Sequence, residues 1–175
     1  MILSDTTIIQ LIREGKLKIL PPIPEKNIKC CHLDLHLAPA LLKYTGSKGD
    51  LKDNSTFATK KIIIPAEGYE LQPHEFVVGS TVEEVFIPNG YMAFVETKGN
   101  IARAGIQTHN TDGHIDPGFN GTITLEITNN SNRTIVIYPH LPFVQVYFFQ
   151  LTGECRYPYY GKYQYQSGPT GYEKD

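Results

Sequence analysis

The stretch GTITLEITN, residues 121–129, predicts a β-strand. Apolar and polar side chains alternate along it, and a period of two places them on opposite faces of a strand. One face carries the aliphatic side chains of Ile123, Leu125 and Ile127, and the other carries threonines and the carboxylate of Glu126. We therefore expect this segment to turn one apolar face toward a hydrophobic core.

Short runs of the same character lie on both sides of this strand, and Gly, Pro and Asn separate them. The runs expected to form strands are residues 33–37, 61–64, 76–78, 85–87, 91–97, 133–138 and 143–151. Evenly spaced short strands with turn residues between them favour an all-β sandwich or barrel. The polar stretch 45–56 is expected to form a loop or a hairpin.

The two ends of the chain differ from its middle. Ser4 can cap a short helix that begins at Asp5, because its hydroxyl oxygen accepts a hydrogen bond from a free backbone N–H, and Gly15 is suited to end that helix. The segment 156–175 is rich in Tyr, Gly, Gln and Lys and has few aliphatic residues. It is either a frayed end or a lid that becomes ordered over a ligand.

The composition bounds the class of protein. The chain has 175 residues, of which 41% are apolar and 19% charged, and its net charge is −2. These values are typical of one folded domain and exclude a disordered chain. No apolar run is long enough for a transmembrane helix, and no signal peptide is visible. The odd count of three cysteines favours a reducing cytoplasm, and the balanced charge argues against nucleic acid as a partner.

Residues 96–129 hold most of the side chains that could carry chemistry. Lys98, Asn100 and Arg103 surround Gly99 directly after an apolar strand. A glycine lets the backbone approach an anion, and two nearby cations can neutralise phosphate. The segment is therefore either an anion-binding loop or a plain turn with solvated charges.

Two carboxylates follow in the same region. Asp116 precedes Pro-Gly, a sequence typical of a turn, so its carboxylate either caps that turn or serves a site. Glu126 lies in the strand among threonines. Inside a barrel it would be partly desolvated and suited to general acid/base catalysis, whereas on an outer sheet face it would be a solvated charge.

A metal site is the competing hypothesis. His32, Asp34 and His36 share one face of a strand with a period of two. A further histidine, at 109, 114 or 140, would complete a facial triad for non-haem iron, but these residue types are also common on a solvated strand face. The sequence has neither a Cys-x-x-Cys pair nor the signature of the zinc deaminases, so we expect no zinc.

Several motifs taken together resemble the dCTP deaminase family of the trimeric dUTPase superfamily. The most specific match is HIDPGFNGTITLEITN, and only residues 40–70 match poorly. The other matching motifs are MILSD, GKLKILP, LDLHL, the stretch 75–106 and GKYQYQSGPT. The resemblance implies a distorted β-barrel or jelly roll of the dUTPase-like type with a short N-terminal helix over residues 1–160, followed by a C-terminal lid over residues 161–175.

The resemblance also implies roles for individual residues. It makes Glu126 the catalytic general acid/base, and a glutamate there favours deamination. It makes Asp116 a carboxylate that contacts the deoxyribose and, in dUTPases, helps to activate water. Two residues depart from the family pattern, since Gly99 lacks the usual hydroxyl and Asp112 replaces a small apolar residue or proline. The residues implied for substrate binding are Lys98, Gly99, Asn100, Arg103, Thr111, Asp112, Asp116, Thr124, Leu125, Gln145, Tyr159, Lys162 and Gln166.

The function that the resemblance implies is the zinc-independent hydrolytic deamination of dCTP, or of a related deoxycytidine nucleotide, to dUTP and ammonia. Mg²⁺ would be bound with the triphosphate. The active sites would lie between the subunits of a cytoplasmic homotrimer, with neither nucleic acid nor a membrane as a partner. Two alternatives stay open: a dUTP diphosphatase or a bifunctional enzyme that forms dUMP from dCTP, and a nucleotide-binding protein with impaired catalysis.

Overall fold

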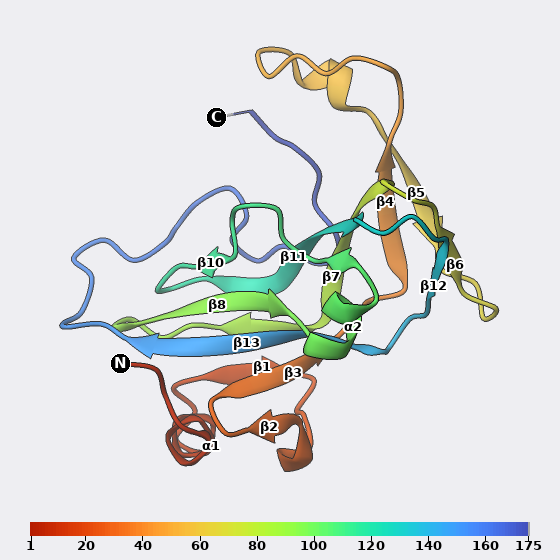
Figure 1. Ribbon diagram of the computed structural model, residues 1–175. Coiled ribbons are helices and arrows are strands. Elements are labelled where there is room, and N and C mark those ends of the chain that lie inside the picture. The colour runs from red at the N-terminus through yellow and green to blue at the C-terminus, as the bar shows by residue number, and fades with distance from the viewer. Residues whose placement is uncertain (175) are drawn as a thin grey trace.

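The computed structural model describes residues 1–174, and Asp175, the last residue of the expected lid, lies outside them. Two antiparallel sheets share one hydrophobic core (Figure 1). The strands of the first sheet are, in spatial order, β5 (Thr59–Ile63), β4 (Ala40–Tyr44), β7 (Phe76–Phe86), β11 (Asn120–Asn129) and β9 (Ile106–Gln107), with β1 (Lys18–Leu20) paired to the end of β7.

The second sheet and a small third sheet complete the mainly β fold that the sequence predicts. The strands of the second sheet are β10 (His114–Ile115), β8 (Tyr91–Thr97), β13 (Pro142–Gln150), β3 (His32–His36) and β2 (Ile28–Lys29). The third sheet pairs β12 (Ile135–Ile137) with β6 (Tyr69–Leu71). The second sheet pairs β8 with both β10 and β13, and the paired residues are 20 to 59 positions apart in the sequence, so residues from distant motifs can meet.

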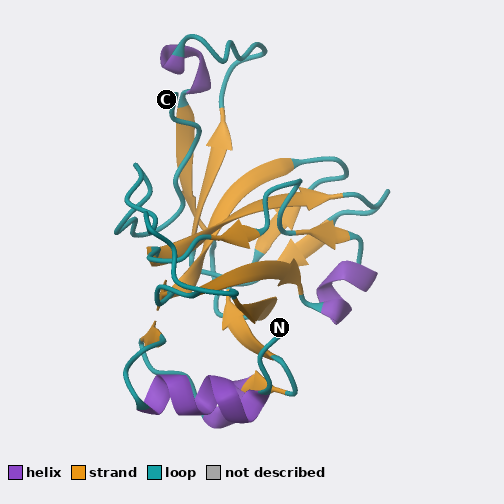
Figure 2. Cartoon of the chain, turned by 90° about the vertical axis from the view of Figure 1, so that its left-hand side faces the viewer, coloured by secondary structure: helices purple, strands orange, loops and turns teal. Residues whose placement is uncertain are grey.

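Helices are few and short (Figure 2). In α1 (Asp5–Arg13), Ser4 is the N-cap and accepts a hydrogen bond from the backbone N–H of Thr7, as the sequence predicts. The helix buries Ile8 and Leu11 against the core. The remaining helical segments are α2 (Gly99–Arg103) and two 3₁₀ turns, Glu25–Asn27 and Asn54–Phe57. Among residues 1–174, none of the helices is both long and apolar enough to cross a membrane.

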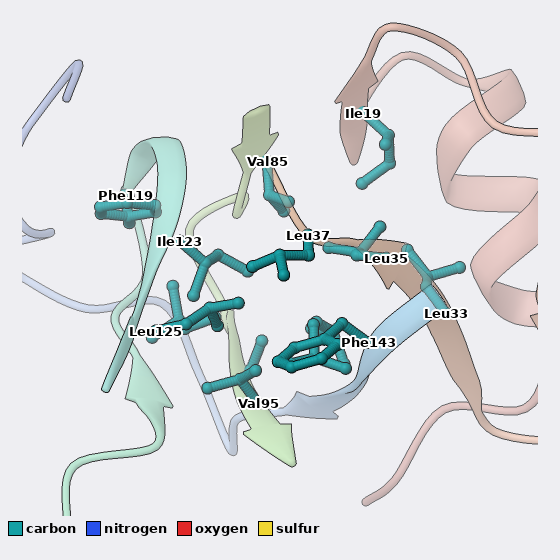
Figure 3. Packing of buried hydrophobic residues seen from close by; sticks show 14 of the residues in the cluster. Ile19, Leu33, Leu35, Leu37, Val85, Val95, Phe119, Ile123, Leu125 and Phe143 are labelled. Atoms are coloured by element: carbon teal, nitrogen blue, oxygen red, sulfur yellow. The ribbon is translucent and has the colours of Figure 1, made fainter. Parts of the chain in front are cut away.

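The core lies between the sheets, and Figure 3 shows side chains from both converging there. Leu33 and Leu35 come from β3, Phe143 from β13, and Ile123 and Leu125 from β11. Four of these five are 0% exposed, and Ile123 is 5% exposed. Burying a large aliphatic or aromatic side chain contributes roughly 1.5–3 kcal/mol, so this cluster holds the sheets together and fixes the face that β11 turns inward.

β7 corrects one expectation, because residues 76–78 and 85–86 belong to one strand rather than two, and Ile87 lies just beyond its end. Thr81 and Glu83 between them are buried and hydrogen bonded, whereas the buried Ser80 hydroxyl has no hydrogen-bond partner within residues 1–174. The Thr81 hydroxyl accepts from the Ile123 N–H at 2.9 Å and donates to the Glu83 carbonyl at 2.7 Å. The first bond gives the Ile123 N–H a partner at the point where the register of β11 with β7 shifts, between Thr122 and Thr124. Such a bulge re-aims the side chains that follow it.

The C-terminal segment is ordered along β11. The Thr122 N–H donates to the Gln166 carbonyl at 3.0 Å, and the Gly168 N–H donates to the Thr122 hydroxyl at 3.0 Å. Gly121 permits this approach, since a Cβ at that position would lie 2.8 Å from the Gln166 carbonyl oxygen. The tail therefore lies on the strand rather than fraying into solvent.

Beyond β11 the tail reaches the long loop that joins β4 to β5 (Figure 1). The backbone N–H of Tyr172 donates to the Tyr44 hydroxyl at 2.7 Å, and its own hydroxyl donates to the Leu51 carbonyl at 2.6 Å. The ring of Tyr172 lies 4.3 Å from that of Phe57, centroid to centroid. We call this set of contacts the tyrosine clasp. It ties the end of the chain to a loop more than 110 residues earlier.

Candidate active site

A cavity of about 790 Å³ lies where the tail crosses β11 and the loop before β10. Its wall combines segments that are distant in sequence, namely β7, β8, β11 and residues 159–172. Seven of the predicted site residues line it: Asp112, Asp116, Thr124, Glu126, Tyr159, Lys162 and Gln166. The predicted carboxylates and the predicted lid therefore meet at one place.

Glu126 stands on the cavity wall because β11 alternates. Its neighbours Leu125 and Ile127 are fully buried in the core, which sends the side chain of Glu126 to the other face. One carboxylate oxygen, Oε2, accepts a hydrogen bond from the Asn110 backbone N–H at 2.8 Å. Within residues 1–174 the other oxygen accepts no hydrogen bond. The carboxylate is thus held at one oxygen and available at the other.

Unpartnered polar atoms belong to other residues that line this cavity. Five buried side-chain nitrogen or oxygen atoms in residues 1–174 have no hydrogen-bond partner, and three of them belong to residues that line the cavity. These are Thr124 Oγ1, Gln166 Oε1 and His109 Nδ1. A buried polar group without a partner costs roughly 1–3 kcal/mol, so their concentration in one cavity is the mark of a site built for a polar ligand.

Asp112 and Asp116 flank His114 on the same wall. His114 Nδ1 lies 2.5 Å from Asp112 Oδ1, and His114 Nε2 lies 3.8 Å from Asp116 Oδ1. All three side chains are partly exposed, by 47% for His114, 67% for Asp112 and 46% for Asp116. They are accessible from the cavity rather than sealed into the core.

The tail supplies the opposite wall. The Tyr159 hydroxyl accepts from the Tyr163 N–H at 3.1 Å, and the Tyr159 ring lies 6.1 Å from that of Phe119. The ammonium group of Lys162 lies over the Tyr163 ring and hydrogen bonds to the Glu173 carbonyl. Gln166 donates from its amide to the Thr122 carbonyl at 2.7 Å, which leaves its Oε1 for the cavity.

The predicted phosphate-binding residues lie outside the cavity lining. Lys98 forms an ion pair with Asp34, 2.6 Å from Nζ to Oδ2, and the Gln145 amide lies 2.9 Å from His32 Nε2 and 3.5 Å from Asp34 Oδ1. We call these four residues the Lys98 cluster. Burial lowers the pKa of His32, and Lys98 adds to this while Asp34 opposes it.

The other predicted residues are also placed away from the cavity. Gly99, Asn100 and Arg103 belong to α2, where Arg103 Nη1 donates to the Gly99 carbonyl at 3.0 Å. The segment is a helical turn, not the plain turn or extended loop that the sequence indicates. Thr111 lies on the loop before β10 and is not part of the lining. Leu125 is fully buried in the core and does not line the cavity.

The iron hypothesis is not supported by the arrangement of its residues. His36 is engaged by Glu83, 2.5 Å from Nδ1 to Oε1, and His32 by Gln145. Among residues 1–174 there is no group of three or more His, Cys, Asp and Glu side chains that could hold a metal ion.

Sequence reasoning missed several residues of the cavity wall. His109 and His114 were weighed only as iron ligands, although they stand in residues 96–129, where most of the candidate side chains lie. Tyr163, Thr170 and Tyr172 belong to the tail, which the sequence marked only as a whole, as a lid or a frayed end. Tyr44 and Phe76 reach the cavity only through strand pairing, and nothing local in the sequence marks them.

The architecture has solved counterparts, which define a class of fold. The structure of 2′-deoxycytidine 5′-triphosphate deaminase from Agrobacterium tumefaciens matches with a TM-score of 0.67 at 21% identity, over 84% of this chain and 47% of that one. Our chain thus spans about half the length of that solved chain. The dUTPase from phage phi11 of S. aureus matches with a TM-score of 0.52 at 16% identity, over 83% and 97% of the two chains. These likenesses establish the dUTPase-like fold.

Sequence comparison narrows the class to a family. A model described as dCTP deaminase-like matches residues 2–151, and the chain belongs to this family. It is 37% identical over 180 residues to a protein of Dictyoglomus thermophilum named "dCTP deaminase, dUMP-forming", with 97% of this chain and 93% of the relative covered. It is 39% identical over 177 residues to a protein of the same name from Coprothermobacter proteolyticus, with 98% and 95% covered.

Proposed function

We propose that this chain hydrolyses dCTP to dUMP, diphosphate and ammonia. The observation that carries the proposal is Glu126, which accepts a hydrogen bond from the Asn110 backbone at one oxygen and lines the same cavity as the unpartnered polar atoms of Thr124 and Gln166. The names of the relatives support dUMP as the end product, in place of the dUTP that the sequence motifs alone led us to expect. Two waters are consumed, one at C4 of cytosine and one at the phosphoanhydride bond.

The first hydrolysis uses Glu126 as a proton shuttle. A water attacks C4 of the cytosine while the Glu126 carboxylate accepts its proton, and the same carboxyl group returns the proton to the amine as the C4–N bond breaks. Backbone groups of the loop near residue 111 and of the strand at Thr124 stabilise the tetrahedral intermediate. The chemistry needs no zinc.

The second hydrolysis releases diphosphate. The α-phosphorus is attacked by water, and diphosphate leaves with Mg²⁺ that enters as part of the substrate. Asp116 contacts the deoxyribose, which connects the two reacting centres and sets the position of both. Two carboxylates near the base and sugar, with cations near the phosphates, match the charge distribution of such a nucleotide.

The cations come from a second copy of the chain. Lys98 and Arg103 lie outside the cavity of their own chain, and a triphosphate that extends from the cavity needs cations near its end. We propose a homotrimer in which the Lys98 cluster of one subunit adjoins the cavity of the next. This proposal also gives Gln145 and Asn100 their place near the triphosphate.

The test of the activity is product analysis. Purified protein is incubated with Mg²⁺ and dCTP, and in parallel with dUTP, and ammonia, diphosphate and nucleotides are measured. The expected result is equal ammonia and diphosphate from dCTP, also in the presence of a zinc-selective chelator. Ammonia without diphosphate would identify a dUTP-forming enzyme. If neither ammonia nor diphosphate is formed, the alternative of a nucleotide-binding protein with impaired catalysis is favoured.

A mixing experiment tests the shared site. Glu126→Gln and Arg103→Ala should each be inactive alone. Mixed after subunit exchange, they should recover part of the activity, because some sites then combine an intact Glu126 with an intact Arg103. No recovery in mixtures that are shown to have exchanged would mean that each chain builds its site alone.

The ordered tail acts as a lid, and the tyrosine clasp holds it closed. Tyr172→Ala removes the hydroxyl's hydrogen bond to the Leu51 carbonyl, worth about 1 kcal/mol, and the ring contact with Phe57, worth about 0.5 kcal/mol or more, but keeps the backbone bond to Tyr44. Nucleotide affinity should therefore fall about tenfold with little change in melting temperature. Tyr160→Ala is the matched control, since Tyr160 is 86% exposed in the same tail. Equal effects of the two changes, or loss of the fold in Tyr172→Ala, would assign the tail a different role.

A further inference from the structure

Gln107 is the last residue of β9, and its side chain binds the loop that follows. The pairing of β9 with β11 places Gln107 opposite Thr128. The amide nitrogen of Gln107 donates to two backbone carbonyls further along the chain, that of His109 at 2.6 Å and that of Asn110 at 3.2 Å. Its amide oxygen accepts from the side-chain amide of Asn130 at 2.9 Å. Because backbone carbonyls only accept hydrogen bonds, the nitrogen must face the loop and the oxygen must face Asn130.

One peptide group connects this side chain to the carboxylate on the cavity wall. The carbonyl of His109 and the N–H of Asn110 belong to the same planar trans peptide group, so they point in opposite directions. Gln107 binds the carbonyl at one end of this group, and the N–H at the other end donates to Glu126 Oε2 at 2.8 Å. The orientation of this single plane therefore decides whether Glu126 faces a hydrogen-bond donor or an acceptor.

The other hydrogen bonds of the loop do not set this orientation. The Thr108 N–H donates to the Thr97 hydroxyl at 3.0 Å, and the Thr108 carbonyl accepts from the Glu126 N–H at 2.9 Å, so both act on the peptide groups before it. Among residues 1–174 the His109 carbonyl accepts a hydrogen bond from Gln107 alone. Without that bond, rotation of the peptide plane would turn a carbonyl toward the Glu126 carboxylate.

We propose that Gln107 is a positioning residue, which holds the peptide group between His109 and Asn110 so that its N–H stays on Glu126. Gln107 does not line the cavity, so its effect on the reaction passes through this peptide group. The inference rests on the proposed function, because Glu126 is assigned the proton transfer there.

The expected consequence is specific to deamination. Glu126 takes a proton from the attacking water and returns it to the amine, and this step is sensitive to small displacements of the carboxylate. The hydrolysis of the phosphoanhydride bond does not use Glu126 in the proposed mechanism. Loss of the Gln107 amide should therefore slow the release of ammonia from dCTP and spare the release of diphosphate from dUTP.

Two variants of similar size test the donor itself. Gln107→Met removes the donor and the acceptor, whereas Gln107→Glu still accepts from Asn130 but offers no donor to the two carbonyls. With Mg²⁺-dCTP, kcat for ammonia should fall about tenfold in Gln107→Met and at least as much in Gln107→Glu, while KM stays within about twofold. Diphosphate release from Mg²⁺-dUTP should stay within about twofold of the parent rate in both variants.

Gln72→Met is the matched control. The Gln72 amide also donates to a backbone carbonyl, that of Glu70 at 3.2 Å, and accepts from the Thr134 hydroxyl at 3.1 Å, but Gln72 lies outside the cavity lining. This variant should change neither product. Hydrogen exchange adds a readout that does not need turnover, since the Asn110 amide should exchange about fivefold faster in Gln107→Met and at the parent rate in the control.

The following results would overturn the inference: parent-like kcat in Gln107→Glu, a rise in KM in place of the fall in kcat, an equal fall in both products, or unchanged exchange of the Asn110 amide. If the Gln107 variants do not fold, Asn130→Ala replaces them. It removes only the partner of the amide oxygen on an exposed residue, and it should show the same pattern with a fall in kcat of about threefold. If the parent protein turns over no dCTP, the proposed function fails, and hydrogen exchange alone decides: faster exchange of the Asn110 amide supports the role of Gln107, and unchanged exchange overturns it.

Discussion

Asn129 and Thr124 lie on the same strand, five residues apart. The polar side-chain atoms of Asn129 are fully hydrogen bonded, whereas the hydroxyl of Thr124 is not. Asn129 is fully buried, and its amide donates to the Leu71 carbonyl at 3.0 Å and the Arg133 carbonyl at 2.7 Å. Its oxygen accepts from the backbone N–H and the hydroxyl of Ser131 at 3.0 and 2.7 Å. Thr124 Oγ1 is also buried and has no partner within residues 1–174.

The difference separates polar groups that hold the fold from those that await a ligand. A satisfied buried amide rigidifies the corner where β11 meets the turn after it, because every donor and acceptor is used. The unpartnered hydroxyl of Thr124 lowers the stability of the free protein, and this cost is removed only when a ligand forms a hydrogen bond to it. One strand therefore serves stability at its end and chemistry in its middle.

The largest effect should come from the middle of the strand. Glu126→Gln keeps the shape and the bond to the Asn110 N–H but cannot accept a proton, so deamination should fall by about 100-fold or more. Nucleotide affinity and melting temperature should stay close to those of the parent protein. Ammonia release at an unchanged rate would exclude Glu126 as the proton shuttle.

The opposite pattern should appear at the end of the strand. Asn129→Ala leaves two carbonyl acceptors and the Ser131 donors without partners, so the free energy of unfolding should fall by about 2–3 kcal/mol. Chemical denaturation measures this. The rate per folded molecule should not change, since Asn129 does not line the cavity. If Asn129→Ala stays as stable as the parent protein but loses turnover, Asn129 serves catalysis rather than stability and the contrast with Thr124 fails.

Thr124→Val should move stability and binding in opposite directions. Removing an unpartnered hydroxyl should leave the stability unchanged or raise it by up to about 1 kcal/mol, while nucleotide affinity falls about five- to tenfold. Thr122→Val is the matched control, because the Thr122 hydroxyl accepts from the Gly168 N–H and its loss should cost stability. If both valine variants lose stability equally, Thr124 is structural too.

The sequence predicted the parts of the fold that local pattern determines. The alternation of Leu33, Leu35 and Leu37 placed three fully buried side chains correctly. It failed within β7, which the pattern divided into two strands, 76–78 and 85–87, although Ser80, Thr81 and Glu83 between them are buried. The burial of Thr81 and Glu83 depends on tertiary hydrogen bonds, such as that from the His36 N–H to Glu83, and no local pattern contains those.

The site was predictable to the extent that its residues stand in one motif. Asp116, Thr124 and Glu126 converge because a single turn and strand carry them. Lys98 and Arg103 were expected at the same place, yet in one chain they lie outside the cavity lining. His114 was present in the quoted motif, but its place on the cavity wall depends on the pairing of β10 with β8, which spacing alone does not reveal.

The smallest predicted effect concerns His32. It is intermediate between Asn129, whose polar atoms are all hydrogen bonded, and Thr124, whose hydroxyl has no partner. Its Nε2 is bonded to the Gln145 amide and its Nδ1 is buried without a partner. Burial is the largest cause that lowers its pKa in the folded protein, whereas the unfolded chain has the ordinary value near 6.5. Below that value the unfolded chain binds more protons than the folded one, so this residue's contribution to stability is present above about pH 6.5 and is lost as pH falls.

Unfolding by urea at several pH values between about 5 and 7.5 measures this contribution. His32→Gln cannot titrate, and its amide can still meet Gln145, so its stability should depend less steeply on pH over this window than that of the parent protein. His74→Asn, an exposed histidine far from the Lys98 cluster, should leave the slope unchanged. An equally steep slope in His32→Gln would mean that the pKa of His32 does not change on folding, so that its unpartnered nitrogen carries no protonation cost. The residue would then belong with the satisfied group of Asn129 rather than with the groups that wait beside Glu126.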